Sequence, residues 1–259
     1  ISFSSDGKRF VTAGEDGTAN IWNVSGQLLG KLPGHQGTVT SISFSPDGQC
    51  LATAGNDGSV KVWDNNGNLL TYLKGHLGRV LEMNFSSDGQ LLLTLGEDGT
   101  GRVWDLEANY EAKIQGNSEI FGGVSFSSNS EKLATVAVDG VTRIWDISGN
   151  LLTEFNGSLG MFGDMSFSPD GKYLATAGDN SQARIWQVLG GELIELEGEE
   201  GMAKQISFSF DGQRLATVGE DGVARIWNNS GERLVELKGH NGRVLDVDFS
   251  PDGKYIGTI

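Results

Sequence analysis

The chain has three histidines, His35, His76 and His240, and each follows a glycine. Near neutral pH, an imidazole is the side chain most suited to serve as a general base or a metal ligand. His35 and His76 are 41 residues apart, and His240 lies four further steps of that length along the chain. Side chains that return at one fixed interval belong to a repeated framework, so we expect the histidines to be structural.

Carboxylates are the second group that could do chemistry, because a pair of them can supply a general acid and a general base. The most regular ones share one position directly before a glycine, at Asp16, Asp57, Asp98, Asp139 and Asp221. Asp-Gly is a preferred sequence for a tight hairpin turn. The segment 64–68, with one aspartate and three asparagines, lacks the terminal bidentate glutamate of a calcium loop. We therefore expect no catalytic residue, no metal and no cofactor, and we predict that the protein is not an enzyme.

The charge of the chain limits its partners. Lysine and arginine total 19 against 34 aspartates and glutamates, a formal net charge of −15. This charge repels phosphate backbones and anionic lipid, so we expect neither nucleic acid nor membrane as a partner. A basic column two residues before the tryptophans could still form an anion site, at Lys61, Arg102, Arg143, Arg184 and Arg225. One such residue in mid-strand of five successive units is better explained by aliphatic stems that pack between neighbouring sheets.

The single cysteine, Cys50, cannot form an internal disulfide, which is compatible with a cytoplasmic location. The aligned positions of the other units hold residues as different as Arg9, Leu91 and Tyr173. A position that accepts such variety is a poor candidate for a nucleophile, so we expect no reactive role for Cys50.

The tryptophans establish the organisation of the chain, because all six are spaced by 41 residues: Trp22, Trp63, Trp104, Trp145, Trp186 and Trp227. A fixed period of this length is the mark of a repeat architecture. Units begin near residues 1, 42, 83, 124, 165, 206 and 247, with no insertions, so the chain holds six units and a further 13 residues. We expect residues 1–259 to form one domain, and the partial unit suggests a fragment of a longer chain.

One unit predicts four strands. Residues 39–45 are β-branched and aromatic, and Ser45-Pro46-Asp47-Gly48 follows as a turn. Residues 51–54, 59–64 and 69–73 are the next three strands, separated by the turns at 56–58 and 65–68. Such a sheet is apolar on both faces and must stack on copies of itself. Radial stacking of four-stranded sheets is the β-propeller solution.

The unit resembles the WD-repeat (WD40) family of β-propellers. The resemblance rests on Gly34-His35, on the segment Phe44 to Gly48 and on Trp63-Asp64, at the repeat length of the family, and it covers the whole chain. The uninterrupted spacing is most similar to prokaryotic, cyanobacterial-type repeats. The resemblance implies an all-β propeller of the seven-bladed type with four-stranded antiparallel blades, of which the last is incomplete.

The resemblance also implies a buried hydrogen-bonded network in each blade. Its members would be His35, Thr53, Asp57 and Trp63 in one unit, and His76, Thr94, Asp98 and Trp104 in the next. Later units depart from the pattern, with Asn117, Ser158 and Glu199 at the His position and Asn180 at the Asp position. Because buried polar groups stabilise well only when all are satisfied, we expect those blades to be looser.

Contacts with partners in this family come from the top face of the propeller. They use the third and fifth residues after the His position and the residue before the hairpin Asp. The candidates here are Arg79, Leu81, Ile120, Met161, Met202, Lys204, Arg243, Leu245, Glu97, Asp179 and Glu220. Ile120, Met161 and Met202 place apolar groups on three successive units, which is typical of a binding surface. The alternative is that these three side chains only plug the central channel.

We thus predict a non-catalytic scaffold that binds a protein or peptide on the top face. The family resemblance suggests the sensor or scaffold part of a larger signalling protein. Two alternatives remain: a hydrolase of propeller fold, and an amplified or designed repeat protein with no selected ligand. The incomplete blade also offers an open sheet edge, so self-association is a further expectation.

Overall fold

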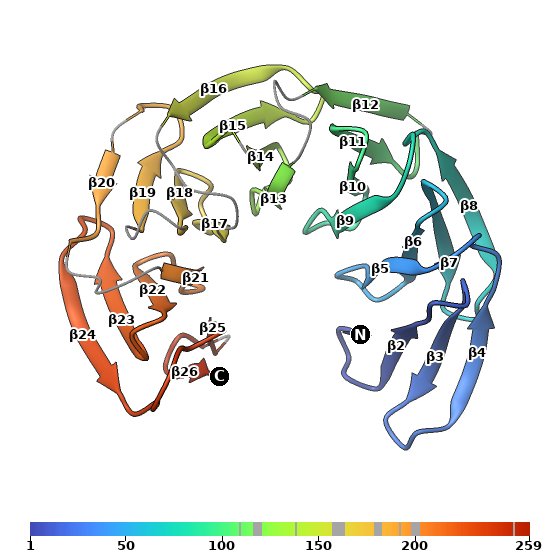
Figure 1. The fold of residues 1–259 in the computed structure, drawn as a ribbon, viewed down its shortest axis with the longest axis horizontal. Helices are drawn as coiled ribbons and strands as arrows, with labels where there is room; N and C mark the ends of the chain where they lie inside the picture. The colour runs from blue at the N-terminus through green and yellow to red at the C-terminus, as the bar shows by residue number, and fades with distance from the viewer. Residues whose placement is uncertain are drawn as a thin grey trace. The chain divides into compact units, whose positions relative to one another are not determined.

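The computed structural model describes residues 1–108, 110–115, 121–137, 139–156, 164–178, 183–191, 193–197, 203–250 and 252–259. Over these ranges the secondary structure consists of strands (Figure 1). They form six four-stranded antiparallel sheets and one two-stranded sheet, each built from strands consecutive in the chain. This is the expected all-β propeller architecture with an incomplete last blade. No helix in these ranges could cross a membrane.

The second sheet shows how a unit folds. It contains β5 (Val39–Phe44), β6 (Cys50–Gly55), β7 (Ser59–Asp64) and β8 (Leu69–Lys74), paired in that order. The first strand ends one residue earlier than expected, because Ser45 already belongs to the turn, where its hydroxyl donates to Asp47. Gly58 has φ 73°, the left-handed conformation that its hairpin requires.

The remaining strands follow the same plan. In the first compact unit, residues 1–120 with 147–149, they are β1 (Ser2–Phe3), β2 (Arg9–Ala13), β3 (Ala19–Asn23), β4 (Leu28–Leu32), β9 (Val80–Phe85), β10 (Leu91–Gly96), β11 (Thr100–Asp105) and β12 (Tyr110–Gln115). In the second, residues 121–146 with 150–259, they are β13 (Phe121–Phe126), β14 (Lys132–Ala137), β15 (Val141–Asp146), β16 (Leu151–Asn156), β17 (Met165–Phe167), β18 (Tyr173–Thr176), β19 (Arg184–Gln187), β20 (Leu193–Glu195), β21 (Ala203–Phe208), β22 (Arg214–Gly219), β23 (Val223–Asn228), β24 (Arg233–Lys238), β25 (Val247–Phe249) and β26 (Ile256–Thr258).

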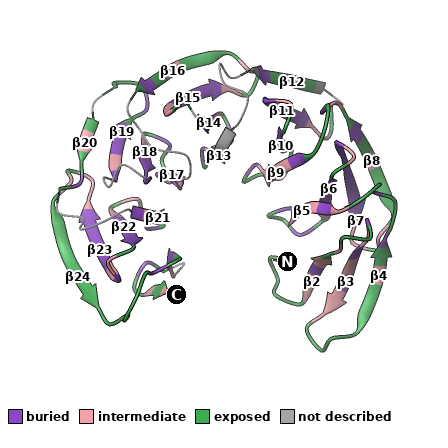
Figure 2. Cartoon of the chain, in the orientation of Figure 1, coloured by how far each residue is buried: buried purple, intermediate pink, exposed green. Residues whose placement is uncertain are grey.

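Burial differs sharply between the strands of a sheet. The second and third strands carry most of the buried residues, whereas fourth strands such as β8, β16 and β24 are largely exposed (Figure 2). Three fourth strands, β4, β8 and β16, still bury one apolar side chain each. Leu32 on β4 packs in one cluster with Trp63, and Phe155 on β16 stacks on Trp186 with ring centroids 4.8 Å apart. Full burial of such a side chain contributes about 2 kcal/mol, so neighbouring sheets stabilise one another.

Candidate functional site

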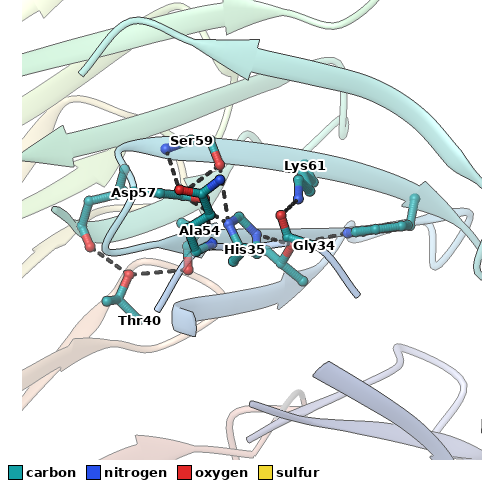
Figure 3. A network of polar contacts seen from close by, with 11 residues as sticks. Gly34, His35, Thr40, Ala54, Asp57, Ser59 and Lys61 are labelled. Carbon is teal, nitrogen blue, oxygen red and sulfur yellow. Dashed lines mark hydrogen bonds and ion pairs between the residues drawn. The ribbon is translucent and has the colours of Figure 1, made fainter. Parts of the chain in front are cut away.

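His35 lies at the centre of a polar network in the second sheet (Figure 3). Its Nε2 is 2.8 Å from Oγ1 of Thr53, which also accepts the indole N–H of Trp63 at 3.0 Å. Its Nδ1 is 3.2 Å from the carboxylate of Asp57, and Ser59 donates to the same carboxylate at 2.7 Å. An ionised carboxylate only accepts, so Nδ1 carries the proton and Nε2 accepts from Thr53. The five side chains form one chain of hydrogen bonds, from Trp63 through Thr53, His35 and Asp57 to Ser59.

The electrostatics of this network keep the imidazole neutral and the carboxylate charged. Burial lowers the pKa of His35 below its usual range, and this effect outweighs the opposing hydrogen bond to Asp57. Burial by itself would raise the pKa of Asp57. Hydrogen bonds from the Gln36 amide, Ser59 and His35 overcome it and lower that pKa to about 2. A neutral imidazole bound to a fixed carboxylate and a threonine has no free nitrogen with which to attack or coordinate a ligand.

The third sheet repeats this arrangement. His76 Nε2 is 2.8 Å from Thr94 Oγ1, its Nδ1 is 3.1 Å from Asp98, and Trp104 donates to Thr94 at 2.9 Å. The third histidine follows the same pattern, because His240 Nε2 lies 2.7 Å from Thr258 Oγ1. All three histidines therefore face the threonine of a second strand.

The aspartate of each network also holds the loop before the first strand. The second oxygen of Asp57 accepts the amide of Gln36 at 2.8 Å, and that of Asp98 accepts the amide of Leu77 at 2.9 Å. In the third sheet, this loop is also joined to the hairpin between the second and third strands, because the Glu97 amide donates to the Arg79 carbonyl at 2.9 Å. The network thus fixes the backbone of the loop and leaves its side chains to solvent. We call these loops and the adjoining hairpins the upper loops.

Seven of the eleven residues that the sequence proposed as partner contacts lie among the described residues, in the upper loops or at the start of the strand that follows. Arg79 and Glu97 are exposed neighbours on the third sheet, and Leu81 is half-buried at the start of β9. In the second compact unit Lys204 lies 3.9 Å from Glu220, and Arg243 and Leu245 are exposed before β25. Four proposed residues, Ile120, Met161, Asp179 and Met202, lie outside the described residues.

Sequence reasoning missed one prominent residue of the upper loops. Leu77 is 87% exposed, although its amide is held by Asp98. The signal was present, because Leu77 directly follows His76 where the preceding unit has the polar Gln36. An exposed leucine on a fixed loop, next to Arg79, adds apolar surface to this side of the sheet.

Comparison with models of known protein families identifies the family of the chain. It matches the family model of the IFT122 first beta-propeller over residues 1–259. The chain belongs to this β-propeller family. A search of curated proteins gave no match. Propellers of this WD type generally mediate protein interactions, and the matched family is a scaffold-type domain.

In this propeller two sheets build the network without histidine. On the fourth sheet Arg143 donates to the hairpin carboxylate of Asp139 at 2.7 Å, and on the sixth Arg225 donates to Asp221 at 2.6 Å. Both arginines are buried. The His positions of these units, Asn117 and Glu199, lie outside the described residues, as do Ser158 and Asn180. These two hairpin carboxylates therefore have a buried arginine as their partner, although their units lack the histidine.

The basic column of the propeller is bound within its own sheets. Besides the hairpin aspartates, the arginines contact fourth-strand glutamates, with Arg143 3.6 Å from Glu154 and Arg184 3.3 Å from Glu195. Arg102 pairs with Glu111, and Lys61 donates to the Gly34 carbonyl. With carboxylates and a carbonyl as partners, these cations do not form an open anion site.

The described part of the propeller holds no group of three or more His, Cys, Asp or Glu side chains suited to a metal ion. One carboxylate has an unusual environment. Asp164, before β17, accepts the amide of Ile206 on the next sheet at 3.0 Å. Burial raises its pKa to about 6, and the charge of Asp246 acts in the same direction. Asp164 is occupied in joining two sheets, and no nucleophile adjoins it among its hydrogen-bond partners.

Proposed function

We propose that the chain is a non-catalytic scaffold that binds a peptide or protein across its upper loops, as the interaction part of a larger signalling protein in the cytoplasm. One observation carries this proposal: each network fixes a loop backbone whose outward side chains differ from unit to unit. The same loop presents Gln36 and Thr38 on the second sheet but Leu77 and Arg79 on the third. A rigid frame with variable side chains is how a repeat scaffold acquires a specific surface.

The proposed surface is mixed in chemistry. Its apolar centre would be Ile120, Met161 and Met202, with Leu77, Leu81 and Leu245 as further apolar contacts. Its charged rim would be Arg79, Lys204, Arg243, Glu97, Asp179 and Glu220. Apolar anchors inside a polar rim are the usual composition of a protein-binding site, and methionine adapts to different partners. We propose that residues 1–259 form one domain that presents this surface.

The experiment compares two double variants of equal charge change. Met161→Asp with Met202→Asp places carboxylates at the apolar centre. Leu151→Asp with Leu152→Asp places them on β16, where both leucines are already exposed. Partners are captured from the native host and identified by mass spectrometry. We expect the methionine variant to lose a partner that the leucine variant retains, with unchanged circular dichroism in both. Retention of every captured partner by the methionine variant would refute the proposed surface.

We also propose self-association through the two-stranded sheet β25–β26. Leu237 on β24 is 40% exposed, whereas Leu73, at the same position of β8, is 8% exposed. Leu237 lines a groove of about 300 Å³ with Phe249 and Ile256. Light scattering should show a dimer whose fraction falls in Leu237→Asp and is unchanged in Leu152→Asp. A monomer at all concentrations would contradict this proposal.

A further inference from the structure

A groove lies on the seam between the second and third sheets, away from the upper loops. It has a volume of about 390 Å³. Val62 and Leu106 supply apolar surface, Leu70 on β8 adds an exposed apolar wall, and Cys50 on β6 lies inside. Asp47, Asp88 and Glu107 also line it, and all three are exposed, so the groove joins an apolar surface to an acidic mouth.

Two of the corresponding seams, those that follow the first and the sixth sheets, contain an arginine that belongs to the chain. At the position of Cys50 the first sheet has Arg9, whose guanidinium lies 3.4 Å from the Asn65 carbonyl across the seam. The sixth sheet has Arg214, whose guanidinium donates to the Gly253 carbonyl of the next sheet at 2.8 Å. The repeat therefore shows twice that a guanidinium fits this seam and binds a backbone oxygen there.

The carbonyl that corresponds to Gly253 is that of Gly89, which lines the groove. Two donors that serve this kind of carbonyl elsewhere are replaced here. Cys50 stands where Arg214 donates to Gly253, and Leu106 stands where Asn65 donates to the Gly48 carbonyl at 2.8 Å. Within the described residues no group donates a hydrogen bond to the Gly89 carbonyl, which leaves an acceptor at the edge of the groove.

The charge of the groove selects the ligand. No lysine or arginine lines it, and across the described ranges neither Asp47 nor Glu107 forms an ion pair. A guanidinium is planar, always charged and rich in donors, so it suits carboxylates and a carbonyl together. Its aliphatic stem packs on apolar surface such as Val62, Leu70 and Leu106. A ligand with a cationic, planar head and an apolar stem meets every feature of the groove.

We propose that this groove binds an arginine side chain of a partner peptide, with the guanidinium at the Gly89 carbonyl and the carboxylates of Asp47 and Glu107. The ligand supplies from outside the group that Arg9 and Arg214 supply within the chain. This site is separate from the upper loops and gives the scaffold a second, basic-peptide contact.

The test titrates the full chain with N-acetyl-arginine N-methylamide and follows the backbone amide signals of Gly89, Gln90 and Leu106 by NMR. The matched probe is the citrulline analogue, which has nearly the same shape and no charge. We expect saturable shifts with the arginine probe and binding weaker by about five-fold or more with citrulline. Equal shifts with both probes, or none with arginine, would overturn the proposal.

Two pairs of variants locate the site. Cys50→Arg places a guanidinium of the chain in the groove, as in the first and sixth sheets, and should weaken binding by about ten-fold or more, while Cys50→Ser should not. Glu107→Gln should weaken it by about two- to five-fold, whereas Glu131→Gln, an exposed carboxylate on another sheet, should leave it unchanged. Unaltered affinity in both Cys50→Arg and Glu107→Gln would show that arginine binds elsewhere and would overturn the proposal.

Discussion

Replacing His35 by asparagine should destabilise the second sheet, and replacing Lys61 by arginine in the same chain should restore part of the loss. His35 makes a hydrogen bond of 2.8 Å with Thr53 and one of 3.2 Å with the charged carboxylate of Asp57. A neutral hydrogen bond contributes about 1 kcal/mol and one to a charged group about 2 kcal/mol, so we expect His35→Asn to lower the free energy of unfolding by about 3 kcal/mol.

The rescue follows from the arginine networks of the other sheets. Arg143 reaches Asp139, four residues earlier, at 2.7 Å, and Lys61 stands at the same distance in sequence from Asp57. Once the imidazole is gone, an arginine at position 61 can take the carboxylate in the same way. A buried charge-assisted bond of this kind contributes about 1–2 kcal/mol, so the double variant should recover roughly half of the loss.

The control is Lys61→Arg with His35 present. Asp57 is then already bound by His35, Ser59 and the Gln36 amide, so the substitution should raise the free energy of unfolding only slightly. Urea unfolding followed by tryptophan fluorescence gives the global free energy. Hydrogen exchange of the β6 and β7 amides gives the free energy of local unfolding of the second sheet. Both measurements are needed because repeat arrays do not always unfold in two states. Equal stability of His35→Asn and the double variant, or an equal gain from Lys61→Arg alone, would refute this reasoning.

Three further predictions concern stability. The pKa values of His35 and His76 are lowered, so the stability that their neutral forms provide is complete above pH 6.5 and is lost as pH falls below it. The midpoint of urea unfolding should therefore depend less on pH in His35→Gln than in the parent protein below pH 6.5. The pKa of Asp164 is raised from 3.8 to about 6, so the stability that its protonated form provides is complete below pH 3.8 and is lost as pH rises through 6. Asp164→Asn should therefore have a free energy of unfolding about 2 kcal/mol higher than the parent protein at pH 7.5, and equal stability would contradict this. Phe155→Ala should cost about 3–4 kcal/mol in thermal unfolding because it removes the stacking on Trp186, while the exposed Leu152→Ala should stay within about 0.5 kcal/mol.

The sequence alone determined the repeat, the strands and the turns. A strict 41-residue spacing of tryptophans leaves little freedom, because each unit is one sheet that must bury both faces against its neighbours. Strand ends were predictable to within one or two residues, as in β6, because Asp-Gly and Pro-Asp-Gly turns act locally. The partners of His35 and His76 could be named in advance because the resemblance to the WD-repeat family implies them.

Only the tertiary structure decided what the departures from the repeat do. Sequence reasoning assigned the basic column to packing between sheets, but Arg143 and Arg225 lie buried against the hairpin carboxylates of their own sheets. For Cys50 it predicted only that the thiol has no reactive role, whereas the structure places the cysteine on a seam where the first and sixth sheets have a guanidinium. Both findings depend on where the guanidinium of an arginine lies rather than on where its Cα lies. The repeat fixes the Cα position, whereas rotamers, charges and neighbouring sheets fix the end of the side chain.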